Sequence, residues 1–335
     1  MNTVQLTRSL RHLIKRGLVP MIHGSPAIAK SAIVKEVANN NKLKLIDLRL
    51  SQCIPEDLLG LASFNHDKTK ARYVPFSTFP LESDPIPKGY DGWLLFLDEI
   101  NSASLSVQSA AFKLVLDRMV GEFQLHERVA IVCAGNKESD KGITNRLSTP
   151  MQSRLIHLEL EVDVATWLDW AERSEIDHRI ISFIKFKNNA LHNFDPNHND
   201  RTFPSPRTYE FLSKIIKKMT SFGEGLEQII EGTIGKGMAR EFIGFSNIYL
   251  QLPTIEGIID GSYKMPTDIS VLFVISEFIS SKATINNISK LAPFINEMPK
   301  EYQVIIYKAM TKRDGELLNN KSVEKWIQNN TEVFQ

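Results

Sequence analysis

The fold of this chain is decided by the stretch Gly24-Ser-Pro-Ala-Ile-Ala-Lys30-Ser31, which follows a β-type apolar run and opens a helical pattern. A phosphate-binding loop requires this strand–loop–helix context. In such a loop, backbone N–H groups and the positive end of the following helix stabilise phosphates, a lysine neutralises them, and a serine hydroxyl ligates Mg²⁺. Lys30 and Ser31 fill the last two roles. The predicted nucleotide-binding residues are Gly24, Ser25, Pro26, Ala27, Ile28, Ala29, Lys30 and Ser31.

Two positions of this loop depart from the usual pattern. Ala29 precedes the lysine, where a glycine is usual, and Ala27 stands where many such loops have another glycine. A left-handed backbone costs alanine about 1–2 kcal/mol relative to glycine. Either the backbone is right-handed at these two positions or nucleotide binding is weakened. The alternative to a phosphate-binding loop is a plain strand–turn–helix that binds no ligand.

A pair of acids follows a second apolar run. The run Trp93–Leu97 has the pattern of a fully buried strand, and it ends in Asp98 and Glu99. Two acids at the carboxyl edge of a central strand are costly unless they ligate a metal or polarise water, although acids are also common where a strand simply meets solvent. Because the phosphate loop lies upstream, we expect Asp98 to hold Mg²⁺ and Glu99 to act as general base on the attacking water.

Asn136 follows a third apolar run, residues 129–134. On its own, an asparagine after a strand is more often a turn residue. If its strand lies between the strand that leads into the phosphate loop and the strand that ends at Asp98, however, Asn136 points at the γ-phosphate and can position the water. The order of the three strands therefore decides its role.

Short β-type runs alternate with helical patterns from residue 19 to about residue 158, which is typical of a parallel sheet covered on both faces. An amphipathic helix at the N-terminus is expected to turn Val4, Leu6, Leu10, Leu13 and Ile14 inward. The fold class is α/β, followed by a helical region. The expected strands are 19–23, 43–48, 93–97, 129–134 and 155–158, and the expected helices are 30–40, 104–118, 164–173, 179–191, 206–219, 226–249, 268–280, 283–295 and 299–333.

The composition excludes several classes of protein. The chain has 335 residues, of which 42% are apolar and 24% charged, and this composition is typical of a folded protein rather than a mainly disordered one. Lysine and arginine total 40 against 39 acids, so composition gives no bulk attraction to nucleic acid or to an anionic membrane. The longest apolar runs are far shorter than the roughly 18–20 residues that cross a bilayer. Two well-separated cysteines, Cys53 and Cys133, suit a reducing interior. We therefore expect a cytoplasmic protein without a membrane segment.

Together these motifs resemble the AAA+ ATPases, and within them the MoxR-type branch of the helix-2-insert clade and the dynein-related AAA group. The likeness covers about residues 1–220. It rests on the phosphate loop, Cys53–Gly60 in the helix-2 region, Leu97–Asn101, the hairpin-like Gly121–His126, and Ala134–Asn136. The resemblance implies a P-loop NTPase core with a parallel five-stranded sheet in the order 5-1-4-3-2, an all-α lid and further C-terminal helices. The implied domains are 1–160 for the core, 161–222 for the lid and 223–335 for the C-terminal extension.

The resemblance also assigns roles to three arginines. Arg154 lies in the segment before the fifth strand that supplies an arginine finger to the neighbouring subunit, a residue worth about 10³–10⁵ in rate. Arg146 is the weaker candidate for that role. Arg207 follows Pro206 at the start of a lid helix, where the family has its sensor-2 arginine, and a proline in the first turn fixes where the helix begins. For Arg154 and Arg146, a surface arginine paired with an acid is the plain alternative.

The implied function is Mg²⁺-dependent ATP hydrolysis in a homo-oligomeric ring, most often a hexamer. MoxR-type proteins resemble assembly or metal-insertion chaperones, so the resemblance implies remodelling of a protein partner, and the expected partner is a protein with a von Willebrand factor A domain. A nucleic-acid translocase or helicase is the alternative from the same clade. It is less favoured because the hairpin region 119–128 carries Glu122 and Glu127 and few cations. A third hypothesis is a nucleotide-binding scaffold that hydrolyses little ATP, because Ala27 stands where many such loops have a glycine.

Overall fold

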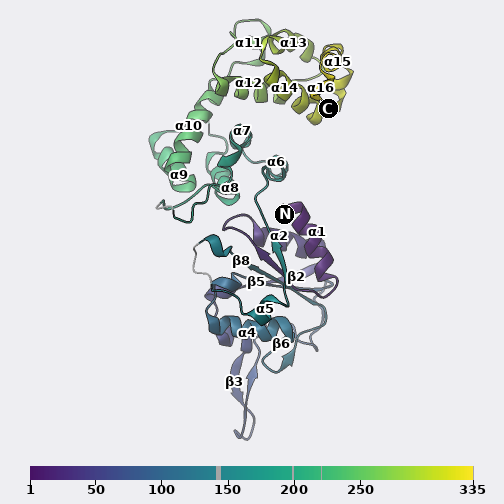
Figure 1. The fold of residues 1–335 in the computed structure, drawn as a ribbon, viewed down its shortest axis with the longest axis vertical. Helices are drawn as coiled ribbons and strands as arrows, with labels where there is room; N and C mark the ends of the chain where they lie inside the picture. Colours follow the sequence, from purple (N-terminus) through teal and green to yellow (C-terminus); the bar gives the residue numbers. More distant parts are fainter. Residues whose placement is uncertain (141–144, 198–199, 220, 335) are drawn as a thin grey trace. The chain divides into compact units, whose positions relative to one another are not determined.

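A computed structural model describes residues 1–140, 145–197, 200–219 and 221–334 (Figure 1). The chain forms two compact units. The first comprises Met1–Trp170, His192–Asn199 and Ser205–Thr208, and the second comprises Ala171–Leu191, Asp200–Pro204 and Tyr209–Gln335.

The first unit is built on a parallel sheet of five strands in the order β2-β5-β8-β1-β9. Numbered one to five along the chain, these strands stand in the order 5-1-4-3-2, so the expected sheet order and the α/β fold class are confirmed. All five predicted strands are present. They are β1 (Pro20–His23), β2 (Leu43–Arg49), β5 (Gly92–Asp98), β8 (Val129–Gly135) and β9 (Ile156–Glu159).

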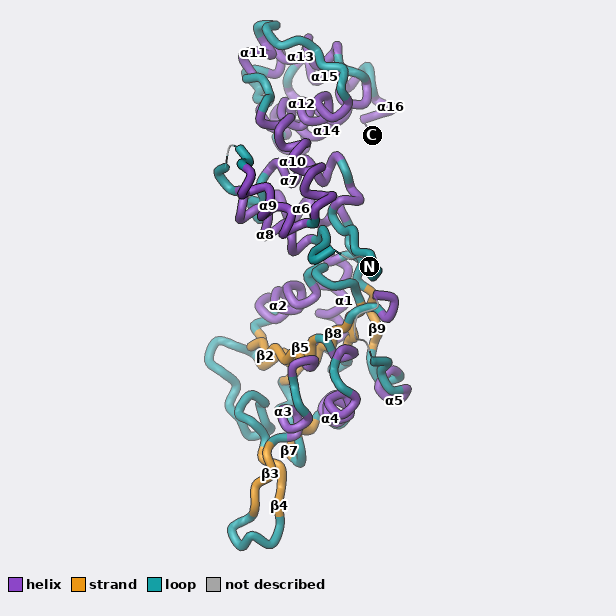
Figure 2. Tube along the Cα trace, turned by 90° about the vertical axis from the view of Figure 1, so that its left-hand side faces the viewer, coloured by secondary structure: helices purple, strands orange, loops and turns teal. Residues whose placement is uncertain are grey.

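Helices cover both faces of this sheet (Figure 2). The alternation of side chains along a strand supplies the two faces. Leu94 and Phe96 of β5 pack in the cluster formed with α1 and α2, whereas Leu95 and Leu97 pack in the cluster formed with α3 and α4. A strand with two apolar faces is therefore buried throughout, which accounts for its continuous apolar run. The covering helices are α1 (Thr3–Ile14), α2 (Lys30–Asn40), α3 (Pro55–Leu59) and α4 (Leu105–Leu116).

One inward residue of the N-terminal helix was predicted wrongly. Leu6 and Leu10 are fully buried, but Val4 is 46% exposed. Val4 lies two positions before Leu6, and two residues turn an α-helix by about 200°, so the two side chains point to opposite faces. The helix itself begins at a capping box, in which Asn2 and Gln5 each accept a backbone N–H of the other.

Two short hairpins extend the first unit. Strands β6 (Met119–Val120) and β7 (Phe123–Gln124) form the hairpin expected before β8. Strands β3 (Leu61–Phe64) and β4 (Ala71–Val74) form a second one that the sequence did not predict. It projects from the sheet (Figures 1 and 2), and all eight of its strand residues are exposed.

The remaining helices confirm the α region, with two corrections. The expected helix 226–249 is two helices, because Gly235 adopts a left-handed φ of 82° between them. The segment 299–333 is likewise interrupted. The helices after β8 are α5 (Thr149–Gln152), α6 (Val164–Arg173), α7 (His178–Phe186), α8 (Pro206–Ile216), α9 (Glu224–Ile234), α10 (Lys236–Leu250), α11 (Ile255–Ile259), α12 (Ile269–Lys282), α13 (Ile288–Glu297), α14 (Lys300–Arg313), α15 (Lys321–Gln328) and α16 (Thr331–Phe334).

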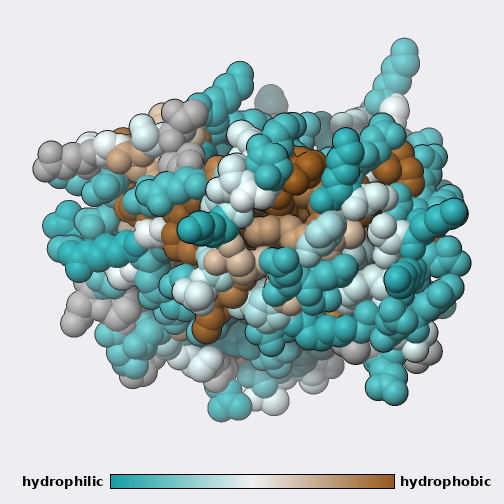
Figure 3. Space-filling model, turned by 90° about the horizontal axis from the view of Figure 1, so that it is seen from above, coloured by the Kyte–Doolittle hydropathy of each residue, from teal (hydrophilic) through white to brown (hydrophobic). Residues whose placement is uncertain are grey.

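The second unit has an apolar core of its own around α12, α13 and α14, in which Tyr307 stacks on Trp326 with ring centroids 4.2 Å apart. Figure 3 views the molecule from above and shows apolar side chains gathered between hydrophilic ones. In the parts of the chain that the structure describes, every helix is too short or too polar to traverse a bilayer.

Candidate nucleotide site

The phosphate loop lies between β1, which ends at His23, and α2, which begins at Lys30. Its first residue must be small, because a Cβ on Gly24 would lie 2.7 Å from the Cδ1 atom of Ile28 and 3.1 Å from the carbonyl oxygen of Leu160. Ile28 is buried in the core beneath α1 and α2, so the loop is anchored by an apolar side chain at its centre.

The loop is left-handed at both alanines. The φ angles are 63° at Ala27 and 73° at Ala29. The right-handed alternative is therefore wrong, and each alanine costs about 1–2 kcal/mol relative to glycine. This strain lowers the stability of the folded chain.

Lys30 is the cation at the centre of the site. Its side chain is only 8% exposed, and Nζ donates hydrogen bonds to the carbonyl oxygens of Gly24 and Ser25 and to Oδ1 of Asn136, the last two at 3.0 Å. Burial lowers the pKa of Lys30 to about 8, partly offset by the charges of Asp98 and Asp140. A buried ammonium surrounded by neutral acceptors is well placed to accept an anion.

Ser31 and Asp98 place oxygen atoms side by side. The hydroxyl of Ser31, in the first turn of α2, donates to Oδ2 of Asp98 at 2.9 Å. Asp98 ends β5, is only 5% exposed, and its Oδ1 accepts the backbone N–H of Glu99 at 2.9 Å. A hydroxyl and a carboxylate are hard oxygen ligands of the kind that Mg²⁺ takes together with phosphate and water. The residues present therefore fit the predicted cation.

Glu99 has a strained backbone and an engaged side chain. Its φ is 57°, a left-handed value that is uncommon for a residue other than glycine and that recurs at functional sites. Its carboxylate accepts a hydrogen bond from the hydroxyl of Ser51 and lies 3.7 Å from Nε of Arg49. The sequence did not predict these two partners, because Arg49 at the end of β2 and Ser51 just after it lie far from Glu99 along the chain.

Asn136 comes directly after β8, which lies between β5 and β1. This is the strand order on which its predicted role depended. Asn101 fixes the backbone of Asn136 by a reciprocal pair of bonds: the amide of Asn101 donates to the carbonyl oxygen of Asn136 at 2.7 Å and accepts its N–H at 3.1 Å. The side chain of Asn136 is thereby left to contact Lys30. Asn101 was not predicted as a site residue, although it is the last residue of the motif Leu97–Asn101.

Two further side chains hold the loop and were also missed. The hydroxyl of Ser25 donates to Oδ1 of Asp140 at 3.4 Å. His192 forms a hydrogen bond with the backbone of Pro26, and burial lowers the pKa of this imidazole. Both partners come from segments distant in sequence, so only the fold brings them to the loop.

The three predicted arginines occupy different places. Arg207 is exposed in the first turn of α8 and lies close enough to Lys30 to contribute to lowering its pKa. Arg154 is exposed two residues before β9, and its Nη1 donates to the carbonyl oxygen of Pro150 at 3.2 Å. Among the described residues, no hydrogen bond or ion pair joins Arg154 to Lys30, Ser31 or Asp98 of its own chain.

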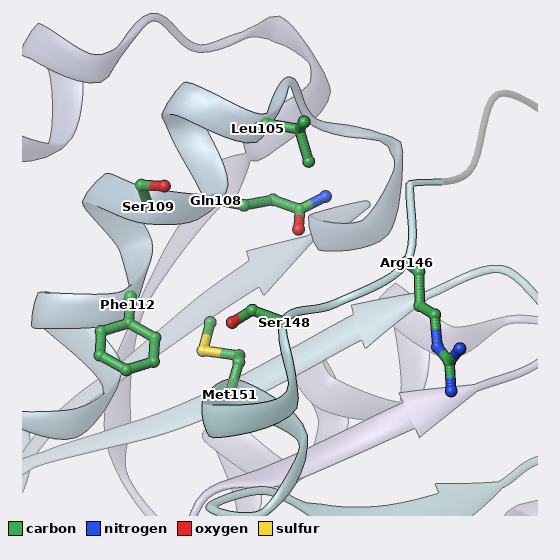
Figure 4. A pocket seen from close by; sticks show the side chains of 7 residues that line it. All are labelled: Leu105, Gln108, Ser109, Phe112, Arg146, Ser148 and Met151. Atoms are coloured by element: carbon green, nitrogen blue, oxygen red, sulfur yellow. The ribbon is translucent and has the colours of Figure 1, made fainter.

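Arg146 lies beside a pocket of about 400 Å³ between α4 and the segment around α5. Figure 4 shows Ser148 and Met151 facing the side chains of α4, whereas Arg146 extends away from them. The lining residues are Leu105, Gln108, Ser109, Phe112, Arg146, Ser148 and Met151.

Comparison with known proteins gives structural neighbours only. No protein-family model matches the chain, and no curated protein matches it. A Cytophaga hutchinsonii protein solved as a candidate ATPase shares 16% identity, with 96% of this chain and 88% of that chain covered and a TM-score of 0.37. The RuvB Holliday junction branch migration motor of Thermotoga maritima shares 16%, with 86% and 83% covered and a TM-score of 0.40. NtrX of Brucella abortus in complex with ADP shares 12%, with 97% and 67% covered and a TM-score of 0.39.

Proposed function

We propose that this chain is a Mg²⁺-dependent ATP hydrolase of the AAA+ type. The observation that carries the proposal is the cluster at the carboxyl edge of the sheet, where Lys30 contacts Asn136 at 3.0 Å and Ser31 contacts Asp98 at 2.9 Å. These four side chains come from three separate strand ends and converge on one loop whose N–H groups lie at a helix N-terminus. Such an arrangement suits the binding of a triphosphate.

The residues divide the chemistry between them. Lys30 neutralises the phosphates, and Ser31 and Asp98 would hold Mg²⁺, which when bound stabilises the charge that develops during phosphoryl transfer. Asn136 orients the attacking water and Glu99 removes its proton. For that step Glu99 must exchange its bond from Ser51 for one from the water. Arg207 adds positive charge from the start of α8.

We further propose that the chain works in a homo-oligomeric ring, most simply a hexamer. Arg154 is exposed and contacts its own segment, so a finger role requires an ATP held by a neighbouring subunit. In this proposal residues 1–160 form the core, 161–222 the lid and 223–335 a C-terminal extension, and hydrolysis moves the lid against the core.

The favoured client is a protein rather than a nucleic acid or a membrane. By its likeness to the MoxR type, the ring would remodel, assemble or load metal into a cytoplasmic partner, for instance one with a von Willebrand factor A domain. The near-neutral charge balance, 40 basic against 39 acidic residues, favours this client class over a polyanion.

The β3–β4 hairpin supports a nucleic-acid motor as the second candidate. Phe64 is 69% and Tyr73 44% exposed, and Lys68, Lys70 and Arg72 lie in the same hairpin. Exposed aromatic rings beside cations can stack bases and contact phosphates. Anisotropy with single-stranded DNA at several salt concentrations tests this candidate. Replacing all three cations by alanine should then reduce the salt slope by about 2, since each contact contributes about 0.7.

Calorimetry and turnover test the main proposal. Lys30→Ala should abolish binding of Mg²⁺-ATP, because no other buried cation replaces its charge within the described loop. Glu99→Gln should bind ATP and lose turnover by about 10²–10⁴-fold, since the amide cannot take a proton. Glu122→Gln, on the β6–β7 turn, is the matched control and should behave as the wild type. Unchanged turnover in Glu99→Gln would show that Glu99 is not the base.

A further inference from the structure

Two histidines outside the nucleotide cluster form a bridge between the phosphate loop and the segment that carries Arg154. His23 is the last residue of β1, directly before Gly24, and His157 lies on β9, the neighbouring parallel strand. The rings stack with centroids 5.1 Å apart, and Nε2 of His23 lies 2.8 Å from Nδ1 of His157.

The second nitrogen of His157 continues the bridge. Nε2 lies 2.9 Å from the carbonyl oxygen of Gln152, the last residue of α5. A carbonyl oxygen can only accept, so Nε2 of His157 carries the hydrogen and Nδ1 of the neutral ring is the acceptor. It follows that Nε2 of His23 is the donor. The hydrogen bonds therefore run in one direction, from His23 through His157 to Gln152.

The bridge joins two parts that the proposed reaction must coordinate. One end is continuous with the loop that would hold the phosphates. The other end fixes α5, which is also held by the bond from Arg154 to Pro150, so the position of Arg154 follows that of α5. We propose that His23 and His157 are positioning residues that couple nucleotide binding in one subunit to the placement of the arginine finger that the same subunit offers to its neighbour.

Charged groups also lie close to the bridge. Glu159 is the register partner of His23, and its carboxylate lies 2.5 Å from Nζ of Lys137. The charge of His23 is among the influences that lower the pKa of Glu159, after the hydrogen bond and charge of Lys137. The terminal amino group of Met1 donates to the carbonyl oxygen of Glu159 at 2.7 Å.

Substitution at His157 tests the proposal, which rests on the proposed ATP hydrolysis. His157→Phe should lower turnover about tenfold, the effect of one lost positioning bond, while leaving the Kd for Mg²⁺-ATP unchanged. His157→Gln can accept from His23 through its amide oxygen and donate to Gln152 through its amide nitrogen. It should therefore keep turnover within about twofold of the wild type, because both bonds of the bridge can form. His66→Gln, at the exposed tip of the β3–β4 hairpin, is the control.

A second readout separates this inference from the function on which it rests. In the wild-type protein, the imidazole ¹⁵N signals of His157 should shift when Mg²⁺-ATP is added, and they should not shift in Lys30→Ala. If ATP is bound and hydrolysed, but these signals stay fixed and His157→Phe turns over within twofold of the wild type, the coupling is refuted and the ATPase stands. If the wild type binds no ATP, both fail.

Discussion

Lys30 sets the chemistry of the site at the scale of a single residue. Its three acceptors are two carbonyl oxygens of the loop and the side chain of Asn136, all of them neutral. They satisfy the hydrogen-bonding capacity of the ammonium but do not compensate its charge, which is why burial dominates its pKa. A triphosphate would supply that charge, so binding should raise the pKa of Lys30.

Binding should depend on pH because the pKa of Lys30 is lower in the free protein than in the complex. The free protein loses the proton of Lys30 as the pH rises through about 8. Because the protonated lysine is the binding form, the Kd for Mg²⁺-ATP should rise about tenfold per pH unit from there up to the pKa of the complex. Calorimetry from about pH 7.5 to about 9.5 measures this. Lys30→Arg stays charged throughout and should show a flat profile; an equally steep profile in that variant would assign the titration to another group.

Strain at Ala29 makes a second residue-scale prediction. Ala29→Gly removes about 1–2 kcal/mol of left-handed strain, whereas the greater freedom of glycine in the unfolded chain costs about 0.4–1 kcal/mol, so stability should rise by up to about 1.6 kcal/mol. Urea unfolding followed by circular dichroism measures the gain. Ala32→Gly is exposed in the right-handed first turn of α2 and should lose stability instead. If both variants lost stability, the explanation by backbone strain at Ala29 would be wrong.

Local motifs were predictable at this scale, and contacts made by folding were not. Lys30, Ser31 and Asp98 could be predicted because each stands at a fixed place next to an apolar run, and the structure brings the three together. Asn101 and Ser51 carried no comparable signal. Each acts on a residue from another segment, and a single sequence does not show which distant segments will meet.

Elements follow the apolar pattern wherever burial generates it. The five sheet strands were predictable because their runs are apolar on one or both faces. The β3–β4 hairpin was missed because its strand residues are exposed, so no core imposes a pattern on residues 61–74. The interruption at Gly235 was missed for the opposite reason: the apolar periodicity of α9 continues into α10, and only the left-handed φ separates them.

The interruption at Gly235 gives an element-scale prediction. Gly235→Ala should destabilise the chain by about 1 kcal/mol, because alanine must adopt φ of 82° there while its Cβ would meet no atom closer than 3.4 Å. The cost would thus come from the backbone alone. Gly244→Ala, in the exposed interior of α10 with open space around it, should stabilise by about 0.5–1 kcal/mol. Shifts of opposite sign in urea midpoints are expected, and shifts of the same sign would refute the backbone explanation.

At the scale of the whole molecule, each unit carries its own core, and the proposed catalytic residues lie in the first. That unit holds every member of the Lys30 cluster together with Arg207 and Arg154. Yet the side-chain hydrogen bond of Arg154 is to Pro150 of its own segment, so one chain supplies a nucleotide site and, separately, an exposed arginine. A complete reaction centre in this scheme needs two chains.

Mixing two inactive variants tests whether the centre is shared. Arg154→Ala should bind ATP and lose about 10³-fold or more in turnover, and Lys30→Ala should bind none. In a mixed assembly, an intact phosphate loop of the first variant can lie beside an intact Arg154 of the second, so turnover should reappear. It should peak near equal amounts and rise with total protein concentration, because assembly is required. Arg146→Ala, the rival finger, should retain turnover alone. If the mixture stays inactive while Arg146→Ala loses turnover, the finger is Arg146.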